Sequence, residues 1–236
     1  MSNPADLMTG HVLKERWTVG DKIIPSPDAT GGHFSVCYQC TDSDGTDVFL
    51  KAMDYTQALR SANPARALQA QTSVYNFETD LLDACKGMSR VVTALDHGSV
   101  DLDPSAIGNV VEYIVFELAE TTVRAKIVGP RRPPLEWCFR IMHNTFSGMR
   151  QLHSKDISHQ DLKPSNVLQQ KDGSAKIADL GRALTPGATV PHEQMPWPGD
   201  LQYAPPEIAY GSLDPCLLYT SPSPRDQRGS RMPSSA

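Results

Sequence analysis

Residues 159–166, HQDLKPSN, and residues 179–181, DLG, are the most informative part of this 236-residue chain, because they gather acids and an amide at close intervals. Asn166 and Asp179 stand thirteen residues apart and offer hard oxygen ligands, the type that magnesium accepts beside phosphate oxygens. Asp161 adds a carboxylate five residues before Asn166. Each acid also has a simpler interpretation, a solvated loop residue for Asp161 and a turn cap for Asp179. The pattern as a whole favours a site for a metal ion and a phosphate group.

A third motif lies further along the chain, YAPPE at 203–207. The three motifs resemble the HxDLKPxN, DLG and APE elements of Hanks-type serine/threonine protein kinases, most of all bacterial ones, in the same order and at similar spacing. The resemblance covers about residues 17–211. It implies an α+β, protein-kinase-like fold of two lobes: a five-stranded antiparallel N-lobe with one main helix, and an incomplete helical C-lobe. The nucleotide is expected in the cleft between them.

The resemblance implies that the protein transfers the γ-phosphoryl group of ATP to a serine or threonine hydroxyl of a protein substrate. Asp161 is then the residue that orients the acceptor hydroxyl and takes its proton late in transfer. Lys163 reaches the transferring phosphate, and a lysine there points to serine or threonine acceptors. Asn166 and Asp179 become the Mg²⁺ ligands. Lys51, in the stretch VFLK, aligns with the lysine that holds the α and β phosphates.

Lys51 needs a carboxylate partner, and the helical pattern at residues 64–85 supplies two candidates. We select Glu78, because it leaves Leu82 one turn later to pack inward, whereas Asp80 would put the leucines out of phase. A single lysine is most often a plain surface residue, so the assignment of Lys51 depends on its position among these motifs. The long interval from Lys51 to Glu78 predicts an expanded loop before the helix.

A phosphate cradle is predicted in TGGHFSVC, residues 30–37, which resembles a glycine-rich loop. Gly31, Gly32 and Phe34 are the candidate ATP-binding residues, and Gly32 supplies the small residue that close backbone approach to phosphate requires. Two glycines of the family pattern are replaced here, the first of them by Thr30. An ordinary hairpin is an equally good interpretation of this segment taken alone.

The adenine base is expected against the stretch FELA, where backbone amide and carbonyl groups would meet its edge. Phe116, Glu117 and Leu118 are the candidate ATP-binding residues of this hinge. Cys37 and Leu168 would sandwich the ring between apolar surfaces. All of these assignments follow from the resemblance.

Alternation and helical periodicity outline the rest of the fold. Strands are predicted at 17–24, 34–40, 48–53, near 90–95, at 109–118 and at 176–178, and helices at 64–85 and 135–152. The segment RRPP at 131–134 breaks the chain before the second helix, whose apolar face we expect to be buried in the second lobe. That face consists of Leu135, Cys138, Phe139, Met142, Phe146, Met149 and Leu152.

Composition describes a globular chain with 39% apolar and 21% charged residues. The net charge of −5, from 22 Lys+Arg and 27 Asp+Glu, argues against a nucleic-acid-binding protein.

The four cysteines before residue 216 are too few and too scattered for a disulfide framework, which fits a cytoplasmic location. Cys37 and Cys40 could form half of a zinc site, but nothing in the sequence completes it. The sequence contains no apolar run long enough to predict a membrane segment.

Four segments are predicted: 1–16, an N-terminal extension; 17–119, the kinase N-lobe and hinge; 120–215, a partial C-lobe; and 216–236, a non-native tail. The tail back-translates to both parts of a widely used transposon sequencing adapter, separated by an index-length gap. A disordered Ser/Pro-rich extension is the alternative. Because the tail carries three arginines and one aspartate, the remainder has a net charge of about −7. The truncated C-lobe predicts that this fragment alone is inactive and poorly stable.

Two other functional classes stay open. A pseudokinase that binds nucleotide or a partner without transfer is favoured by Phe49, Thr30 and Asp200, which stand where the family has alanine, glycine and threonine. The intact lysine, acids and asparagine of the motifs oppose it. Small-molecule kinases of the aminoglycoside or choline type share an Asp-x4-Asn loop, but Lys163 with Pro164, and the PPE element, weigh against that class.

Overall fold

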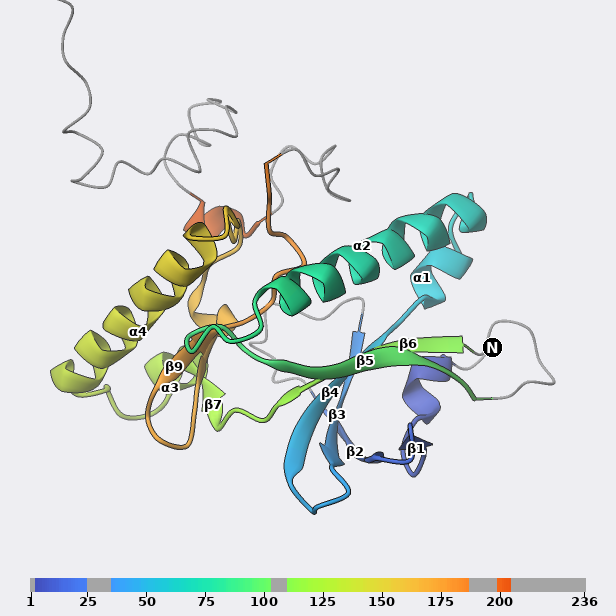
Figure 1. Ribbon diagram of the computed structural model, residues 1–236, viewed down its shortest axis with the longest axis horizontal. Coiled ribbons are helices and arrows are strands. Elements are labelled where there is room, and N and C mark those ends of the chain that lie inside the picture. The colour runs from blue at the N-terminus through green and yellow to red at the C-terminus, as the bar shows by residue number, and fades with distance from the viewer. Residues whose placement is uncertain (1–2, 25–34, 103–109, 187–198, 205–236) are drawn as a thin grey trace, which may run out of the picture.

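The computed structural model describes residues 3–24, 35–102, 110–186 and 199–204, and within them the chain forms two lobes (Figure 1). The first lobe is built on an antiparallel six-stranded sheet in the order β1-β2-β3-β4-β6-β5. Its strands are β1 Val12–Leu13, β2 Trp17–Ile23, β3 Ser35–Thr41, β4 Asp47–Met53, β5 Ala94–Asp101 and β6 Val110–Glu117. The predicted α+β fold of two lobes is confirmed, and the two-residue β1 adds to the five predicted strands.

The helices divide between the lobes. The first lobe holds the 3-10 helix η1 Pro4–Leu7, α1 Thr56–Leu59 and α2 Pro64–Ala84. The second holds α3 Val123–Val128, α4 Leu135–His153, the 3-10 helices η2 Pro164–Asn166 and η3 Leu201–Tyr203, and a sheet of β7 Thr121–Thr122, β8 Val167–Gln169 and β9 Ala175–Ile177. Figure 1 shows α2 along one side of the large sheet and α4 at the end of the molecule away from β1.

Side chains of the large sheet alternate between two apolar cores, as the two-residue repeat of a strand requires. On β4, Val48, Leu50 and Ala52 are buried in a core on the outer face of the sheet. The residues between them lie on the opposite, inner face, where Met53 joins a core shared with α2 and the second lobe. This alternation also places Lys51 on the inner face.

The N-terminal segment, predicted as an extension, packs onto the outer face of the sheet. Ala5, Met8 and Leu13 of this segment are each at most 2% exposed in that core, where they join Trp17 of β2. The Trp17 indole Nε1 donates a hydrogen bond to Asp96 Oδ2 at 2.9 Å, and Lys14 Nζ pairs with Asp96 Oδ1 at 2.6 Å. The described residues of this segment therefore form part of the first lobe.

The predicted strand near 90–95 is displaced in the structure, where β5 begins at Ala94. The reason is that the preceding residues pair with the second lobe: Val91 forms a parallel bridge with Ile177, and Val92 N–H donates to Ile177 O at 2.8 Å. Backbone groups committed to β9 are not free to join the large sheet. This segment consequently links the two lobes.

The predicted helix at 64–85 is present as α2. It begins with an Asn63 cap, whose Oδ1 accepts a hydrogen bond from Arg66 N–H at 3.2 Å, and with Pro64 in its first turn. Its buried side chains all lie in the C-terminal half, from Tyr75 onwards. The interval predicted as an expanded loop contains the short helix α1.

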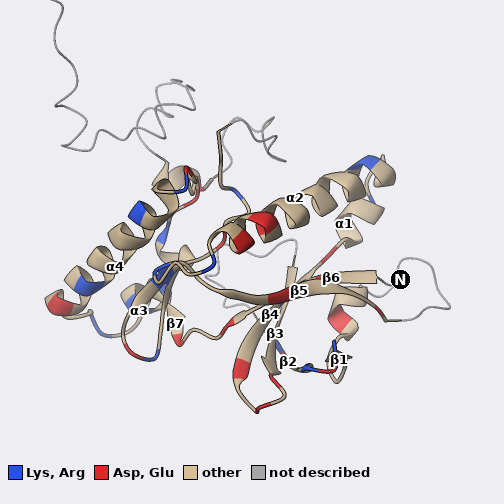
Figure 2. Cartoon of the chain, in the orientation of Figure 1, with Lys and Arg blue, Asp and Glu red and all other residues tan. Residues whose placement is uncertain are grey.

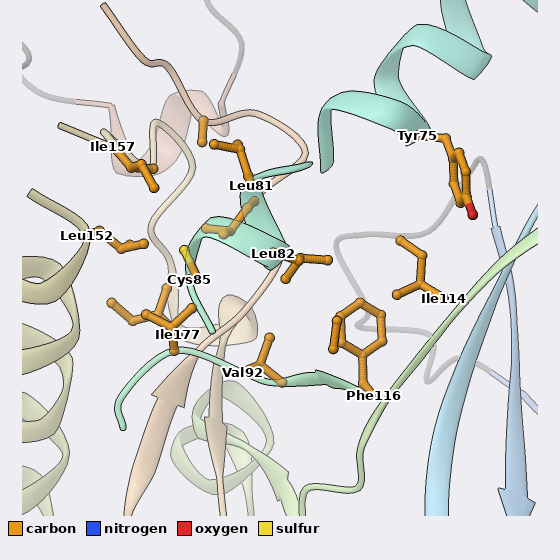
Figure 3. Close-up of a cluster of buried hydrophobic side chains, with 14 of the residues drawn as sticks. Tyr75, Leu81, Leu82, Cys85, Val92, Ile114, Phe116, Leu152, Ile157 and Ile177 are labelled. Carbon is orange, nitrogen blue, oxygen red and sulfur yellow. The ribbon is translucent and has the colours of Figure 1, made fainter. Parts of the chain in front are cut away.

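The inner core joins α2 to the second lobe (Figure 3). Leu82 of α2 and Cys85, the residue that follows the helix, belong to the same cluster as Val92, Leu152 and Ile177. These side chains come from both lobes, so burial of their apolar surface stabilises the contact between them.

The prediction for the second helix was right for Leu152 and Met149, which contribute to the inner core, but wrong for Leu135, Phe139, Met142 and Phe146, which are exposed. In α4 the buried positions are Ile141, Asn144, Gly148 and Leu152, which face β9 and its neighbours. A Cβ at Gly148 would lie 2.6 Å from Arg90 O, so the close approach depends on glycine. The predicted apolar face combined positions of this buried face with positions of a second, exposed face of the same helix.

That second face is the exposed α4 stripe, which consists of Leu135 at 69%, Phe139 at 62%, Met142 at 50% and Phe146 at 66% exposure. In the part of the chain that the structure describes, no segment covers it. Within the same ranges, no helix combines the length and the apolar character needed to cross a bilayer.

Candidate functional site

A cavity of about 910 Å³ lies between the two lobes. All eleven predicted site residues that fall within the described ranges line it: Cys37, Lys51, Glu78, Phe116, Glu117, Leu118, Asp161, Lys163, Asn166, Leu168 and Asp179. The other three predicted residues, Gly31, Gly32 and Phe34, lie outside the described residues. The cavity therefore brings together side chains that are more than 140 positions apart in the sequence, from Cys37 to Asp179.

One end of the cavity is built around Lys51. Its Nζ lies 2.9 Å from both carboxylate oxygens of Glu78, which α2 holds 2% exposed. The same Nζ lies 4.0 Å from Asp179 Oδ1. Figure 2 shows acidic residues gathered on the C-terminal half of α2, the half that carries Glu78. Selection of Glu78 over Asp80 agrees with this geometry, because Asp80 is exposed.

Burial and charge oppose each other in this group. Burial alone would lower the pKa of Lys51, but the carboxylates of Glu78 and Asp179 outweigh it and raise that pKa. Burial raises the pKa of Glu78 despite the nearby ammonium of Lys51. Burial also acts to raise the pKa of Asp179, but Lys51 and the other nearby cations lower it overall. Lys51 is thus held as a cation, and Asp179 as an anion, beside an open cavity.

A second cluster surrounds Asp161, which is 9% exposed. Lys163 Nζ lies 2.9 Å from Asp161 Oδ2. The Asn166 amide Nδ2 donates to the backbone oxygen of Asp161 at 2.9 Å and to Oδ2 at 3.2 Å. Asp200 N–H donates to the other oxygen, Oδ1, at 2.8 Å. Both carboxylate oxygens of Asp161 are therefore fixed, and the bonds of Asn166 use its nitrogen, which leaves its amide oxygen for a cation.

His159 is a structural member of this cluster that the sequence reasoning did not select. It is 1% exposed, its Nε2 lies 3.0 Å from Ala178 O, and its Nδ1 accepts a hydrogen bond from Asp161 N–H at 3.3 Å. Burial lowers the pKa of His159. A neutral ring with its proton on Nε2 satisfies both contacts, and it connects the loop of Asp161 to the residue before Asp179.

Asp179 itself, and Gln160 next to Asp161, adopt left-handed backbone conformations. Gln160 has φ of 63° and Asp179 has φ of 64°. Such conformations are strained for residues other than glycine, and they occur most often where a site requires a particular side-chain direction. They occur here next to, and at, the two acids of the DLG and HQD motifs.

The opposite end of the cavity is apolar. Phe49 and Phe116 are register partners on β4 and β6, and their ring centroids are 6.3 Å apart. Cys37, whose pKa burial raises, and Leu168 also line this end. The residues predicted to enclose the base therefore lie on one cavity.

Glu117 has a side-chain role that the sequence did not indicate. Its carboxylate oxygens each lie 2.7 Å from Lys176 Nζ, and Oε1 accepts a hydrogen bond from Thr93 N–H at 2.7 Å. The carboxylate is thus occupied by β9 and by the segment before β5. The backbone N–H of Glu117 is occupied as well, because it donates to Thr93 O at 3.2 Å.

The zinc alternative is not supported. Cys40 is buried in the outer core, whereas Cys37 lines the cavity on the inner face, so the two thiols lie on opposite faces of β3. Within the described ranges there is no cluster of three or more potential ligands of the His, Cys, Asp or Glu type.

Asp200 was predicted only as a departure from the family pattern, and the structure adds its contacts. Its Oδ2 lies 3.8 Å from Lys163 Nζ, besides the bond from its amide to Asp161. The signal in the sequence is its place shortly before YAPPE, and the structure brings Asp200 itself against the loop of Asp161. Residues 205–207 of that motif lie outside the described residues.

A family model described as protein kinase domain matches residues 30–214 of the chain. Similar curated proteins include extracellular signal-regulated kinase 1 of Dictyostelium discoideum, 38% identical over 77 residues, which are 33% of this chain and 15% of that protein. Cyclin-dependent kinase F-1 of Oryza sativa subsp. japonica is 35% identical over 107 residues, 45% of this chain and 22% of that protein. The matched segments thus span less than a quarter of these relatives' own length.

Proposed function

This chain belongs to the protein kinase domain family, and from that premise we propose that its protein transfers the γ-phosphoryl group of ATP to a serine or threonine hydroxyl of a protein substrate. The observation that carries the proposal is the position of Lys51 between Glu78 and Asp179, in the same cavity as Asp161 and Asn166. A relative named mitogen-activated protein kinase 3 supports a protein as the acceptor.

In this proposal Lys51 holds the phosphates of ATP, and the apolar end of the cavity holds its base. Lys51, fixed by Glu78, binds the α and β phosphates, and a cation held in place before the substrate arrives loses little entropy on binding. Phe116, Glu117 and Leu118 offer backbone groups to the adenine edge, while Cys37 and Leu168 contact its faces. Gly31, Gly32 and Phe34 complete the phosphate cradle in this proposal. The apolar character of the base end supports it.

Asn166 and Asp179 would hold Mg²⁺, and their oxygen atoms fit the preference of that ion. Bound there, the ion would neutralise negative charge on the phosphates. The lowered pKa of Asp179 supports this role, because a ligand of a divalent cation must be ionised.

Asp161 orients the acceptor hydroxyl and accepts its proton late in transfer. Its two carboxylate oxygens are already fixed by Lys163, Asn166 and Asp200, so little reorganisation is required when the acceptor binds. Lys163 neutralises charge on the transferring phosphoryl group. We place the protein in the cytoplasm and expect no nucleic-acid partner, in line with its acidic charge.

The proposal is tested with full-length protein, Mg-ATP labelled in the γ-phosphate and a mixed protein substrate. Asp161→Ala should lower transfer by about 10²- to 10⁴-fold while ATP binding persists. Asp179→Asn should remove most of the Mg²⁺-dependent ATP binding. Asp172→Asn, the same change as Asp179→Asn at an exposed turn, is the matched control and should behave as the parent protein. Transfer that survives Asp161→Ala unchanged would reject the assigned role.

A pseudokinase is the second candidate, and two observations favour it. Phe49 places a ring in the cavity where the family has alanine, and Asp200 places a further carboxylate 3.8 Å from Lys163. In that case the parent protein would bind Mg-ATP and show no transfer to any substrate. The binding and transfer measurements above therefore separate the two candidates.

A further inference from the structure

Residues 96–98 of β5 are held by Lys14, which lies in the turn between β1 and β2. Lys14 Nζ lies 2.6 Å from Asp96 Oδ1 and donates a hydrogen bond to His97 O at 2.7 Å. Asp96 also accepts the hydrogen bond of Trp17 Nε1 at 2.9 Å. Burial would raise the pKa of Asp96, but the hydrogen bonds that it accepts outweigh this effect and lower that pKa. The N-terminal segment therefore holds a charged carboxylate near the start of β5.

The backbone and the surroundings of Lys14 are adapted to this contact. Lys14 and Glu15 have φ of 47° and 56°, a left-handed conformation that glycine or asparagine adopts at lower cost. A Cβ at Gly98 would lie 3.1 Å from Lys14 Cε and 3.0 Å from the Tyr113 hydroxyl, so glycine leaves room for the lysine stem. A long basic side chain is thus kept at a turn position that its own conformational preference does not favour.

Helix α2 is attached to the same residues of β5 from the inner face of the sheet. The Tyr75 hydroxyl donates to Gly98 O at 3.1 Å and lies 3.3 Å from Tyr113 O of β6. Tyr75 is 6% exposed within the inner core (Figure 3). Glu78 follows Tyr75 by three residues, so both side chains lie on one face of α2. The Tyr75 contacts therefore fix the part of the helix that presents Glu78 to Lys51.

We infer that Lys14 and Tyr75 are positioning residues for Glu78. Both act through residues 96–98 of β5, which they contact from opposite faces of the sheet. The pairing of β5 with β6 shifts its register immediately before these residues, so the strand ladder is interrupted there and other contacts must fix them. If they shift, the acceptor of Tyr75 moves with them, and α2 carries Glu78 away from Lys51. The inference rests on the proposed function, in which Lys51 binds the phosphates of ATP.

The experiment uses full-length protein and two measurements: the affinity for Mg-ATP by calorimetry, and the hydrogen exchange of the α2 amides by mass spectrometry. Lys14→Met and Tyr75→Phe each remove only the polar contact to β5. Each should weaken Mg-ATP binding by about three- to tenfold and speed exchange in α2 by at least about threefold. Unchanged exchange in both variants would overturn the inference.

Two matched control variants remove contacts of the N-terminal segment that do not reach β5. Lys22→Met removes an exposed ion pair with Asp6, and Tyr38→Phe removes a buried hydrogen bond to Ala5 O. Both are expected to lower the melting temperature slightly, but to leave Mg-ATP affinity and α2 exchange as in the parent protein. Equal changes in the controls would mean that a general loss of stability explains the effect, which would reject the positioning role.

A double-mutant cycle tests whether the two residues act through Glu78. Glu78→Ala should itself weaken Mg-ATP binding. Adding Lys14→Met or Tyr75→Phe to it should change the affinity by less than about 1.5-fold further, because no carboxylate remains to be positioned against Lys51. A further loss of the full three- to tenfold would show that they act by another route, contrary to the inference.

The two measurements separate this inference from the proposed function. If the parent protein does not bind Mg-ATP, but exchange in α2 rises in both variants and not in the controls, the proposed function fails and the positioning contacts stand. If the parent and both variants bind Mg-ATP equally well, the positioning role is rejected and the proposed function stands.

Discussion

The outer face of the large sheet and the outer face of α4 are both apolar, but only the first is covered. In the first lobe the segment of η1 buries Ala5 and Met8 against the sheet, each at most 1% exposed. On α4, the four side chains of the exposed α4 stripe are at least half exposed. The covering segment precedes residue 30, where the kinase family match begins. A core of this lobe is thus completed by residues outside the shared family region.

Trp17→Ala is expected to have the largest effect, because it removes a side chain from the covered face. The indole is fully buried, and its loss leaves both a cavity and an unpaired Asp96 oxygen, so the free energy of unfolding should fall by about 3–5 kcal/mol. Urea denaturation followed by circular dichroism measures the change. Phe139→Ala, on the exposed α4 stripe, should change the same free energy by less than about 0.5 kcal/mol. Equal losses in the two variants would contradict the contrast between the faces.

The reactivity of single cysteine thiols compares the buried cores with α4. Burial raises the pKa of Cys40, in the outer core, and of Cys85, in the inner core, each to about 11. At pH 8 only about one thiol in a thousand is then ionised at each site. Cys138 of α4 is half-buried, and we expect it to react with iodoacetamide at least about a hundredfold faster than either. Peptide mass spectrometry measures the three rates. Rapid labelling of Cys85 would mean that the inner core opens easily.

The link between the two lobes is tested by breaking the pair of Glu117 and Lys176. The two side chains are 25% and 18% exposed and meet at 2.7 Å, so Lys176→Met should lower the free energy of unfolding by about 1–2 kcal/mol. Lys171→Met, in the exposed turn of the same hairpin, is the control and should change it by less than about 0.5 kcal/mol. A double variant with Glu117→Gln should lose less than the sum of the single losses; additive losses would show that the pair is not coupled.

The smallest expected effect concerns the surface ion pair between Arg16 and Asp42, which joins the N-terminal segment to the end of β3. Arg16 NH2 lies 2.8 Å from Asp42 Oδ2, and the hydrogen bond from Arg16 lowers the pKa of Asp42 to about 2. Because this pKa lies below its ordinary value of 3.8, the pair stabilises the fold above about pH 4, and that stability is lost as the pH falls toward 2. Asp42→Asn should remove this acid-dependent part. Denaturation of both proteins between pH 2 and 6 checks it: a constant difference over that range would contradict the assignment.

Much of the fold was readable in the sequence because local patterns decide it. Strict alternation placed β3 and β4, and the period of the apolar residues, together with Asn63 and Pro64, placed α2 within one residue at its end. The site was readable for a different reason. The spacing of Asp161, Asn166 and Asp179 matched a known family, and all eleven predicted site residues within the described ranges line one cavity.

The parts that were not predicted depend on contacts between distant residues. The start of β5 moved because Val91 and Val92 pair with Ile177, which lies more than eighty positions away. The buried face of α4 was misassigned because Phe139 and Ile141 look alike in a sequence, and only the neighbouring β9 decides which is buried. Lys176 and His159 gave no pattern of their own, since their partners are backbone groups and a distant carboxylate.

The bond from Asp200 N–H to Asp161 Oδ1 joins residues 39 positions apart, and this separation has a consequence during synthesis. A ribosome adds about 5–20 residues per second, so Asp161 leaves it roughly 2–8 seconds before Asp200 does. During that interval the nascent chain already contains the whole HQDLKPSN loop, but one oxygen of its acid still lacks the donor that fixes it. Translation order therefore delays the final alignment of Asp161 until the later segment has emerged.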